Sequence, residues 1–109
     1  QHDEQSFVLR DRRALSRDGF ATAVVCVDRI TGDMVSEPEM VSSGIVDHGN
    51  VPELKVGAIE TIRQELENGM TQGMEQSELK NRVTNALTAY LYKQTGRRPL
   101  VTVVLVETG

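Results

Sequence analysis

Two stretches of the chain carry apolar residues at both odd and even positions. They are Phe20–Asp28 and Leu100–Val106. Strands with both faces covered show such a continuous apolar run, whereas half-exposed strands alternate apolar with polar residues. We therefore expect each stretch to form a strand that is shielded, or nearly so, on both sides.

A third extended segment is expected between these two strands. The polar link Arg29–Asp33 contains Gly32, which can adopt a positive φ and so form a hairpin turn. The segment that follows should therefore run antiparallel to the first strand. Pro38 interrupts it and lacks an amide proton, which suits an edge strand or a bulge, and the extended pattern resumes at Met40–Val46. This pattern predicts a long, irregular edge strand.

Two helices are predicted before the last strand. The first begins after the capping residue Asn50, with Glu53 able to reach back toward the cap, and Gly69 is its expected C-cap. The second ends at Gly96 and Pro99. Apolar residues recur at helical spacing in both segments: Leu54, Ala58, Ile59, Ile62 and Leu66 in the first, and Leu79, Val83, Ala86, Leu87, Tyr90 and Leu91 in the second.

The order strand, strand, helix, helix, strand predicts an α+β fold of two layers, with a short helix over Arg10–Ser16 in front. Two successive helices reverse the chain twice, so the last strand should run parallel to the first and pair beside it. We expect a mixed three-stranded sheet in the order 2-1-3, with both helices packed on one face (topology ββααβ). Residues 1–18 are interpreted as a linker end with a short basic segment, and residues 19–109 as the domain.

One face of this predicted sheet has no cover. Two helices on one side bury only that side, whereas the first and last strands offer no polar face for water. The apolar residues on the uncovered side, which are every second residue of the first and last strands, must therefore contact a partner or the rest of a longer chain. The candidate interface residues are Val25, Val27, Val101, Val103 and Leu105.

Length and composition narrow the class of protein. The chain has 109 residues, 39% hydrophobic and 26% charged, with a formal net charge of -4. One core is therefore expected, and the overall acidity disfavours non-specific nucleic-acid binding. The single cysteine favours a reducing compartment, which predicts a cytoplasmic location. The longest apolar run, Phe20–Val27, is too short to cross a bilayer, so no membrane contact is expected. Because the chain starts at Gln1, we expect it to be part of a longer protein.

Catalytic and metal-binding patterns are missing from the sequence. His2 and His48 share no motif, and Cys26 lies within an apolar stretch, where a lone cysteine is typically a small core residue. Asp47 and His48 are adjacent, but no motif ties a nucleophile to them. Phosphate-binding glycine motifs are also missing. We therefore expect no catalytic residue, metal site or cofactor in this chain. We also do not expect the chain to be an enzyme by itself.

Charge is distributed unevenly, which keeps an RNA-binding alternative open. Residues 33–78 hold ten acidic and two basic residues, whereas residues 79–99 hold five basic and no acidic ones. Clustered cations suffice for phosphate contacts, although a salt-bridged or dipole-matched surface explains the same pattern. The element order also resembles a KH domain of the second type, but the loop Gly69–Gly73 is one residue too long and lacks a basic residue. The candidate RNA contacts are Arg10, Arg12, Arg13, Arg17, Arg97 and Arg98.

Three stretches in fixed order have counterparts in a known family: residues 8–19 (VLRDRRALSRDG), residues 27–46 (VDRITGDMVSEPEMVSSGIV) and residues 78–100, which open with ELKNRV and close with TGRRPL. Together they resemble the C-terminal domain of ribonuclease J over residues 8–106. The resemblance implies a longer parent protein with a metallo-β-lactamase core that holds two zinc ions, an inserted β-CASP domain, a linker and this end domain. Such a parent cuts RNA internally and also degrades it from the 5′ end.

The resemblance carries no catalytic residue into this chain. The family's His-x-His-x-Asp-His metal motif has no counterpart here, so zinc is expected in the parent and not in this fragment. There, zinc-activated water would attack the phosphodiester. The chain also departs from the family at residues 42–47 (SSGIVD), where relatives often carry a basic residue and aromatics.

The sequence and the resemblance together favour an assembly module of a ribonuclease. The uncovered face predicts a homodimer, or docking on the catalytic core of the parent, which would bring RNA to the assembly. An RNA-binding module, either KH-like or built on the arginine patch, is the alternative.

Overall fold

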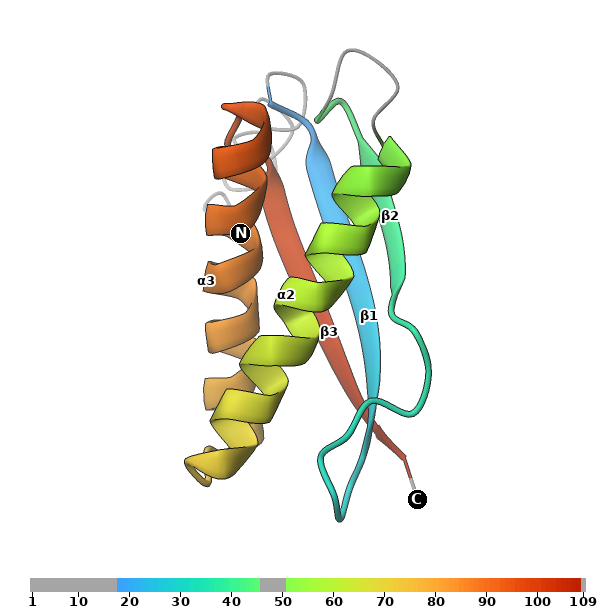
Figure 1. Cartoon of the computed structure of the whole chain (residues 1–109), viewed down its shortest axis with the longest axis vertical. Coiled ribbons are helices and arrows are strands. Elements are labelled where there is room, and N and C mark those ends of the chain that lie inside the picture. Colours follow the sequence, from blue (N-terminus) through green and yellow to red (C-terminus); the bar gives the residue numbers. More distant parts are fainter. Residues whose placement is uncertain (1–17, 46–50, 109) are drawn as a thin grey trace, which may run out of the picture.

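The computed structural model describes residues 18–45 and 51–108 of the chain. Its elements follow in the order β1 (Phe20–Asp28), β2 (Glu39–Ser43), α2 (Val51–Thr71), α3 (Gln76–Thr95) and β3 (Leu100–Thr108). Figure 1 shows the three strands in one layer and the two helices in a second layer against it. The predicted α+β architecture with ββααβ order is confirmed.

The sheet has β1 at its centre and the strand order β2-β1-β3, as predicted. β2 pairs antiparallel with β1, with Thr22 opposite Val41, and β3 pairs parallel with β1, with Phe20 opposite Leu100. The parallel pair runs the full length of both strands. Parallel strands need a long crossover, and α2 and α3 supply it here.

The hairpin link between β1 and β2 closes around Asp28. Its carboxylate accepts hydrogen bonds from the backbone amides of Ile30 at 2.8 Å and Thr31 at 3.0 Å, and Gly32 has a φ of 77°. The predicted glycine turn is therefore confirmed. β2 is shorter than the predicted Met40–Val46, because its pairing with β1 starts at Glu39 and ends at Ser43; Val46 lies outside the described residues.

The core lies between the sheet and the helices. Every second residue of β1 points into it, and the helices contribute most of the residues expected from their spacing. Ile59 and Ala86, which were also expected there, are only partly buried and lie outside the core cluster. Its buried members are Ala21, Ala23, Val25, Val27 and Val103 from the strands, Ile45 after β2, Ala58, Ile62 and Leu66 from α2, and Val83, Leu87 and Leu91 from α3. The alanines at the centre of β1 leave room for the large helix side chains, as dense packing requires.

The two helices pack against each other at two glycines of α2. A side chain at Gly57 would collide with the hydroxyl of Tyr90, and one at Gly69 would collide with Leu79. The prediction of Gly69 as a C-cap is therefore wrong: α2 continues to Thr71, and the positive φ (70°) occurs at Gly73. A hydrogen-bonded ion pair, Arg82 Nε to Glu65 Oε1 at 2.7 Å, also joins α3 to α2.

Both ends of α3 are capped, and its C-terminal end agrees with the predicted stop at Gly96. The backbone amide of Glu75 donates to Glu78 Oε1 at 3.3 Å. Gly96 ends the helix in the left-handed region, and its amide donates to the carbonyl of Tyr92.

Neither of the two described helices has the length and hydropathy that a membrane span requires. The predicted helix over residues 10–16 lies outside the described residues, and the predicted domain boundary at residue 18 stays a prediction.

Replacing Gly57 with Ala should destabilise the protein although Ala is the better helix former. The steric conflict with the Tyr90 ring should cost about 1–3 kcal/mol, which exceeds the gain of about 1 kcal/mol in helix propensity. In a Tyr90→Ala background the same change should instead stabilise, because the ring is gone. Urea unfolding of the four proteins in this double-mutant cycle measures both signs. The same sign in both backgrounds would contradict this helix–helix contact.

The turn carboxylate should make stability depend on pH. The backbone hydrogen bonds from Thr31 and Ile30 lower the pKa of Asp28 below its ordinary value of about 3.8. The ionised form is therefore favoured by folding, and its contribution is present above the unfolded-state pKa and lost as the pH falls through the folded-state pKa. Asp28→Ala should thus lower the thermal midpoint at pH 7, by an amount that shrinks below about pH 4.

The matched control for this prediction is Asp33→Ala. Asp33 takes part in the turn through its main-chain carbonyl, which accepts from the amide of Asp28 at 2.8 Å and survives the substitution. The thermal midpoint of Asp33→Ala should stay near that of the unsubstituted protein, both at pH 7 and below about pH 4. A pH-independent loss in Asp28→Ala would argue against the carboxylate as the source of stability.

Candidate functional site

The side of the sheet that faces away from the helices is the main candidate site. Because side chains alternate along a strand, the residues next to the buried ones point to this side. We call the open face the set of Phe20, Thr22, Val24 and Cys26 of β1, Val41 of β2, and Leu100, Thr102, Val104 and Val106 of β3.

The strand register makes the open face continuous. Val24 lies beside Val104, Cys26 beside Val106, and Phe20 beside Leu100. Cross-strand neighbours on one face touch, so these pairs form an apolar surface that is interrupted by the Thr22–Thr102 pair between Phe20–Leu100 and Val24–Val104. Its large side chains remain accessible: the exposed fraction is 62% for Val41, 37% for Leu100, 40% for Val104 and 39% for Val106.

Polar groups border this apolar centre. Asp28 continues the outward-pointing positions of β1, and Glu39 lies opposite Val24 at the β2 edge. Surfaces of folded proteins that expose several large apolar side chains side by side commonly mark interaction sites. An apolar centre with a polar rim is also the usual anatomy of a protein–protein interface.

The predicted interface residues lie on the other side of the sheet. Val25, Val27 and Val103 are buried in the core, and Val101 and Leu105 pack against it beneath the helices. Val25, Val27 and Val103 are therefore inaccessible to a partner, and Val101 and Leu105 are partly buried on the same, helix-covered side, so these five residues do not form the uncovered face. As predicted, one side of the sheet has no described helix or strand over it, but the residues that form this side are the alternate ones.

Cys26 also differs from its expected place. Its side chain belongs to the open face and is partly exposed, beside Val106 and not among the core residues. Continuous apolar strands give no signal that separates the two faces, so the sequence could not assign it. As the single cysteine of the chain, it is a natural reporter for the open face.

The two described arginines of the candidate RNA patch hold the ends of three strands together. Arg97 Nη1 donates to the carbonyl of Gly44 at 2.7 Å, just after β2, and the Arg98 amide donates to Asp18 Oδ2 at 3.3 Å, just before β1. The Arg98 guanidinium also lies over the ring of Tyr92, 4.8 Å from its centre. Sequence reasoning missed Tyr92, since a contact across the end of a helix has no periodic signal.

The remaining RNA-binding predictions stay predictions. Arg10, Arg12, Arg13 and Arg17 lie outside the described residues, so their distance from Arg97 and Arg98 is undefined. The KH-like loop is not formed as expected, because Gly69 is buried within α2 and only Gly73 lies in the turn.

Metal chemistry finds no support in the part of the chain that the structure describes. Within residues 18–45 and 51–108, no three His, Cys, Asp or Glu side chains are placed to hold a metal ion. These residues do not fit the two-zinc site that the family resemblance implies for a longer parent. His2 and His48 lie outside the described residues.

Comparison with known families gives a clear match. The model of the family described as "Ribonuclease J C-terminal domain" matches residues 7–108. The chain belongs to this family. The match confirms the resemblance seen in the three sequence stretches. In this ribonuclease J C-terminal domain the second stretch belongs to the β1–β2 hairpin, and the third forms α3 and the link to β3. Most of the first stretch, up to residue 17, lies outside the described residues.

Curated relatives agree with the family match. The chain is 36% identical over 106 residues to Ribonuclease J2 of Bacillus subtilis, 34% identical to Ribonuclease J 2 of Staphylococcus epidermidis and 33% identical to Ribonuclease J 2 of Staphylococcus aureus. Each alignment covers 96% of this chain but 19% of the relative. The chain thus spans about a fifth of the length of these relatives.

Adjacent residues of β3 provide a test of the two faces of this ribonuclease J C-terminal domain. Val103→Asp places a charge in the core and should destabilise the fold by about 3 kcal/mol or more. Val104→Asp places the same charge on the open face and should cost within about 1 kcal/mol. Urea unfolding at low protein concentration measures both, without a contribution from association. Equal losses would contradict the assignment of the faces.

Proposed function

We propose that the chain is the assembly module of a longer ribonuclease J-type enzyme, and that its open face packs against a second copy. The carrying observation is that Leu100, Val104 and Val106 of β3 and Val41 of β2 lie exposed on one continuous side of the sheet. Burying that side removes apolar area from water, which is the main driving force for association.

A flat sheet face suits a second copy for a geometric reason. Two sheets stack face to face at about 10 Å with their inner side chains interdigitated, and a twofold axis presents the same surface on both partners. The valines and Leu100 of the open face are apolar and of medium size, so they can interdigitate. The hydroxyls of Thr22 and Thr102 lie between them and would hydrogen-bond across the interface. Docking on the catalytic core of the same protein is the alternative use of the face.

The activity of the longer protein is proposed from its relatives. Proteins similar to this chain are named ribonucleases, and the chain spans about a fifth of their length. We propose a cytoplasmic enzyme that hydrolyses RNA, both internally and from the 5′ end, with zinc bound by residues outside this chain. The chain would act at a distance from that chemistry by fixing how copies of the enzyme assemble, and RNA would reach the assembly through the rest of the enzyme.

Sedimentation equilibrium over a wide concentration range tests the assembly proposal. The 109-residue chain should form a dimer whose dissociation constant rises at least about tenfold, equivalent to about 1.4 kcal/mol, in Val104→Asp. Lys80→Glu, on the exposed side of α3, is the matched control and should leave dimerisation unchanged.

The thiol of Cys26 gives a second, independent measurement of the same proposal. Its reaction with a maleimide should slow as the protein concentration rises, because the dimer covers the open face. A chain that stays monomeric at all concentrations would contradict pairing of two copies. Protection of Cys26 in the longer enzyme alone would then assign the face to its catalytic core.

A further inference from the structure

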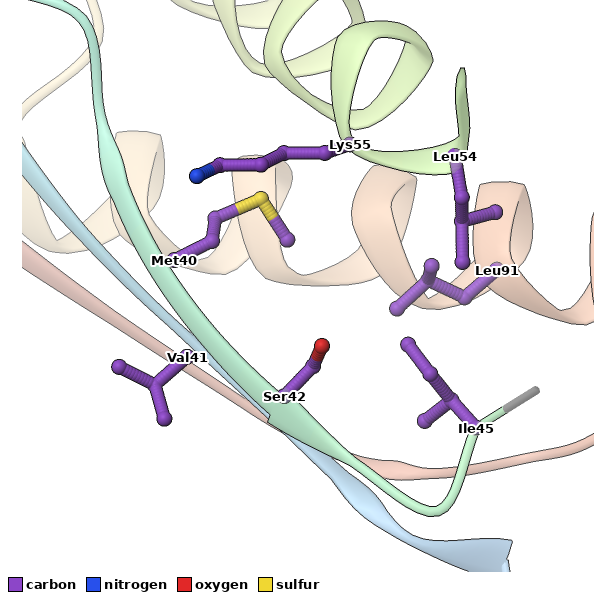
Figure 2. A pocket seen from close by; sticks show the side chains of 7 residues that line it. All are labelled: Met40, Val41, Ser42, Ile45, Leu54, Lys55 and Leu91. Atoms are coloured by element: carbon purple, nitrogen blue, oxygen red, sulfur yellow. The ribbon is translucent and has the colours of Figure 1, made fainter. Parts of the chain in front are cut away.

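A second apolar surface lies on the helix side of the sheet, between β2 and the first turns of α2. Met40, Ile45, Leu54 and Leu91 line a groove of about 340 Å³ there, with Ser42 on its strand side. This volume is at the lower end of the roughly 300–1,000 Å³ of small-molecule pockets, so it holds a few side chains and not a large cofactor. Figure 2 shows the apolar side chains converging from the strand and both helices.

The groove runs beside a strand edge that no other described strand occupies. β2 is the outer strand of the order β2-β1-β3, so alternate residues of β2 direct their amide and carbonyl groups away from β1. An added strand would pair with these groups. Its side chains would alternate between the groove on the helix side and the exposed Val41 on the open side.

Among the described residues that line the groove, Lys55 is the one that carries a charge, and no described residue forms an ion pair with its ammonium group. In Figure 2 the Lys55 side chain reaches from α2 across toward Met40, while Val41 points away from the groove. A carboxylate on an added strand would meet this cation at the rim of an apolar site, where water is partly excluded.

We propose that the β2 edge and this groove bind an extended peptide segment of another protein. The peptide adds a strand to β2, inserts one apolar side chain between Met40 and Leu54, and presents an acidic residue to Lys55. Backbone hydrogen bonds at a sheet edge supply affinity in this mode, and pockets for alternate side chains supply specificity. This surface is separate from the proposed assembly role of the open face, apart from the shared Val41.

A second copy of the chain fits the groove less well than a foreign peptide. If two β2 strands paired edge to edge, the helix-side residues that each strand offered to the other would be Met40 and Ser42. Neither carries a carboxylate, and Glu39 points to the opposite side of the sheet. The helix-side residues of a second β2 strand would therefore bring no carboxylate to Lys55, which favours a peptide with its own acidic residue.

Selection from a phage-displayed library of random dodecapeptides against the immobilised 109-residue chain tests the proposal. The enriched sequences should share alternate apolar positions and at least one Asp or Glu. A synthetic peptide of the consensus sequence should then shift the amide resonances of Glu39–Ser43 and of Leu54 and Lys55, with β3 unaffected. No enrichment, or shifts confined to β3, would overturn the proposal.

Charge reversal tests the acidic contact. Lys55→Glu should weaken binding of the consensus peptide about tenfold, and replacing the acidic residue of the peptide by Lys should restore binding to this variant. Lys80→Glu on α3 is the matched control and should bind like the unmodified chain. Equal effects of the two substitutions would overturn the assigned contact. Concentration-dependent shifts in β2 without peptide would show that a second copy occupies the edge, which also contradicts the proposal.

Discussion

The burial of one side of β1 beneath two helices is the interaction on which the rest of the structure depends. Ala21, Ala23, Val25 and Val27 are fully or almost fully buried at the centre of the sheet. They share one core cluster with the larger side chains of the helices, among them Ile62 of α2 and Leu87 of α3. Dense packing of this kind fixes the phase of the strand, because a shift by one residue would exchange its two faces.

That constraint leaves the other side of a narrow sheet without a cover. Two helices suffice for one layer, and nothing else among the described residues crosses the open face. The apolar character of β1 and β3 on both sides would be costly in water unless a partner covered it. The architecture therefore supports the proposal that this domain binds partners through its surfaces. Its two candidate surfaces, the open face and the groove beside β2, lie on different sides of the same sheet.

The charge pattern of the sequence is explained in part by contacts within the fold. The acidic α2 and the basic α3 lie side by side, and Glu65 pairs with Arg82 between them. Arg97 and Arg98 link the strand ends through Gly44 and Asp18. Basic residues that sequence reasoning offered to RNA thus also have structural tasks. A cluster of basic residues in a sequence does not distinguish RNA binding from contacts within the fold, since both require the same side chains.

Local patterns were sufficient to predict the order, direction and type of the elements. Helical spacing, the Gly32 turn and the Gly96 stop are encoded within a few residues, so β1, the β1–β2 turn and the end of α3 were predicted correctly. Gly69 was assigned as a C-cap because a glycine near a helix end usually has that role. In the structure it lies within α2, and its lack of a side chain leaves room for Leu79 of α3. That contact involves a residue of another helix and has no local signal.

The identity of the exposed residues was decided by tertiary structure alone. β1 and β3 are apolar at odd and even positions, so their sequences predict an uncovered face without showing which residues form it. Packing against α2 and α3 places Val103 in the core and Val104 outside, and it leaves Cys26 on the open face. The groove at Lys55 likewise exists only where β2 and α2 meet. Sequence alone determined the fold and the presence of an apolar sheet side without helices over it, whereas the residues that form that side depend on contacts between distant segments.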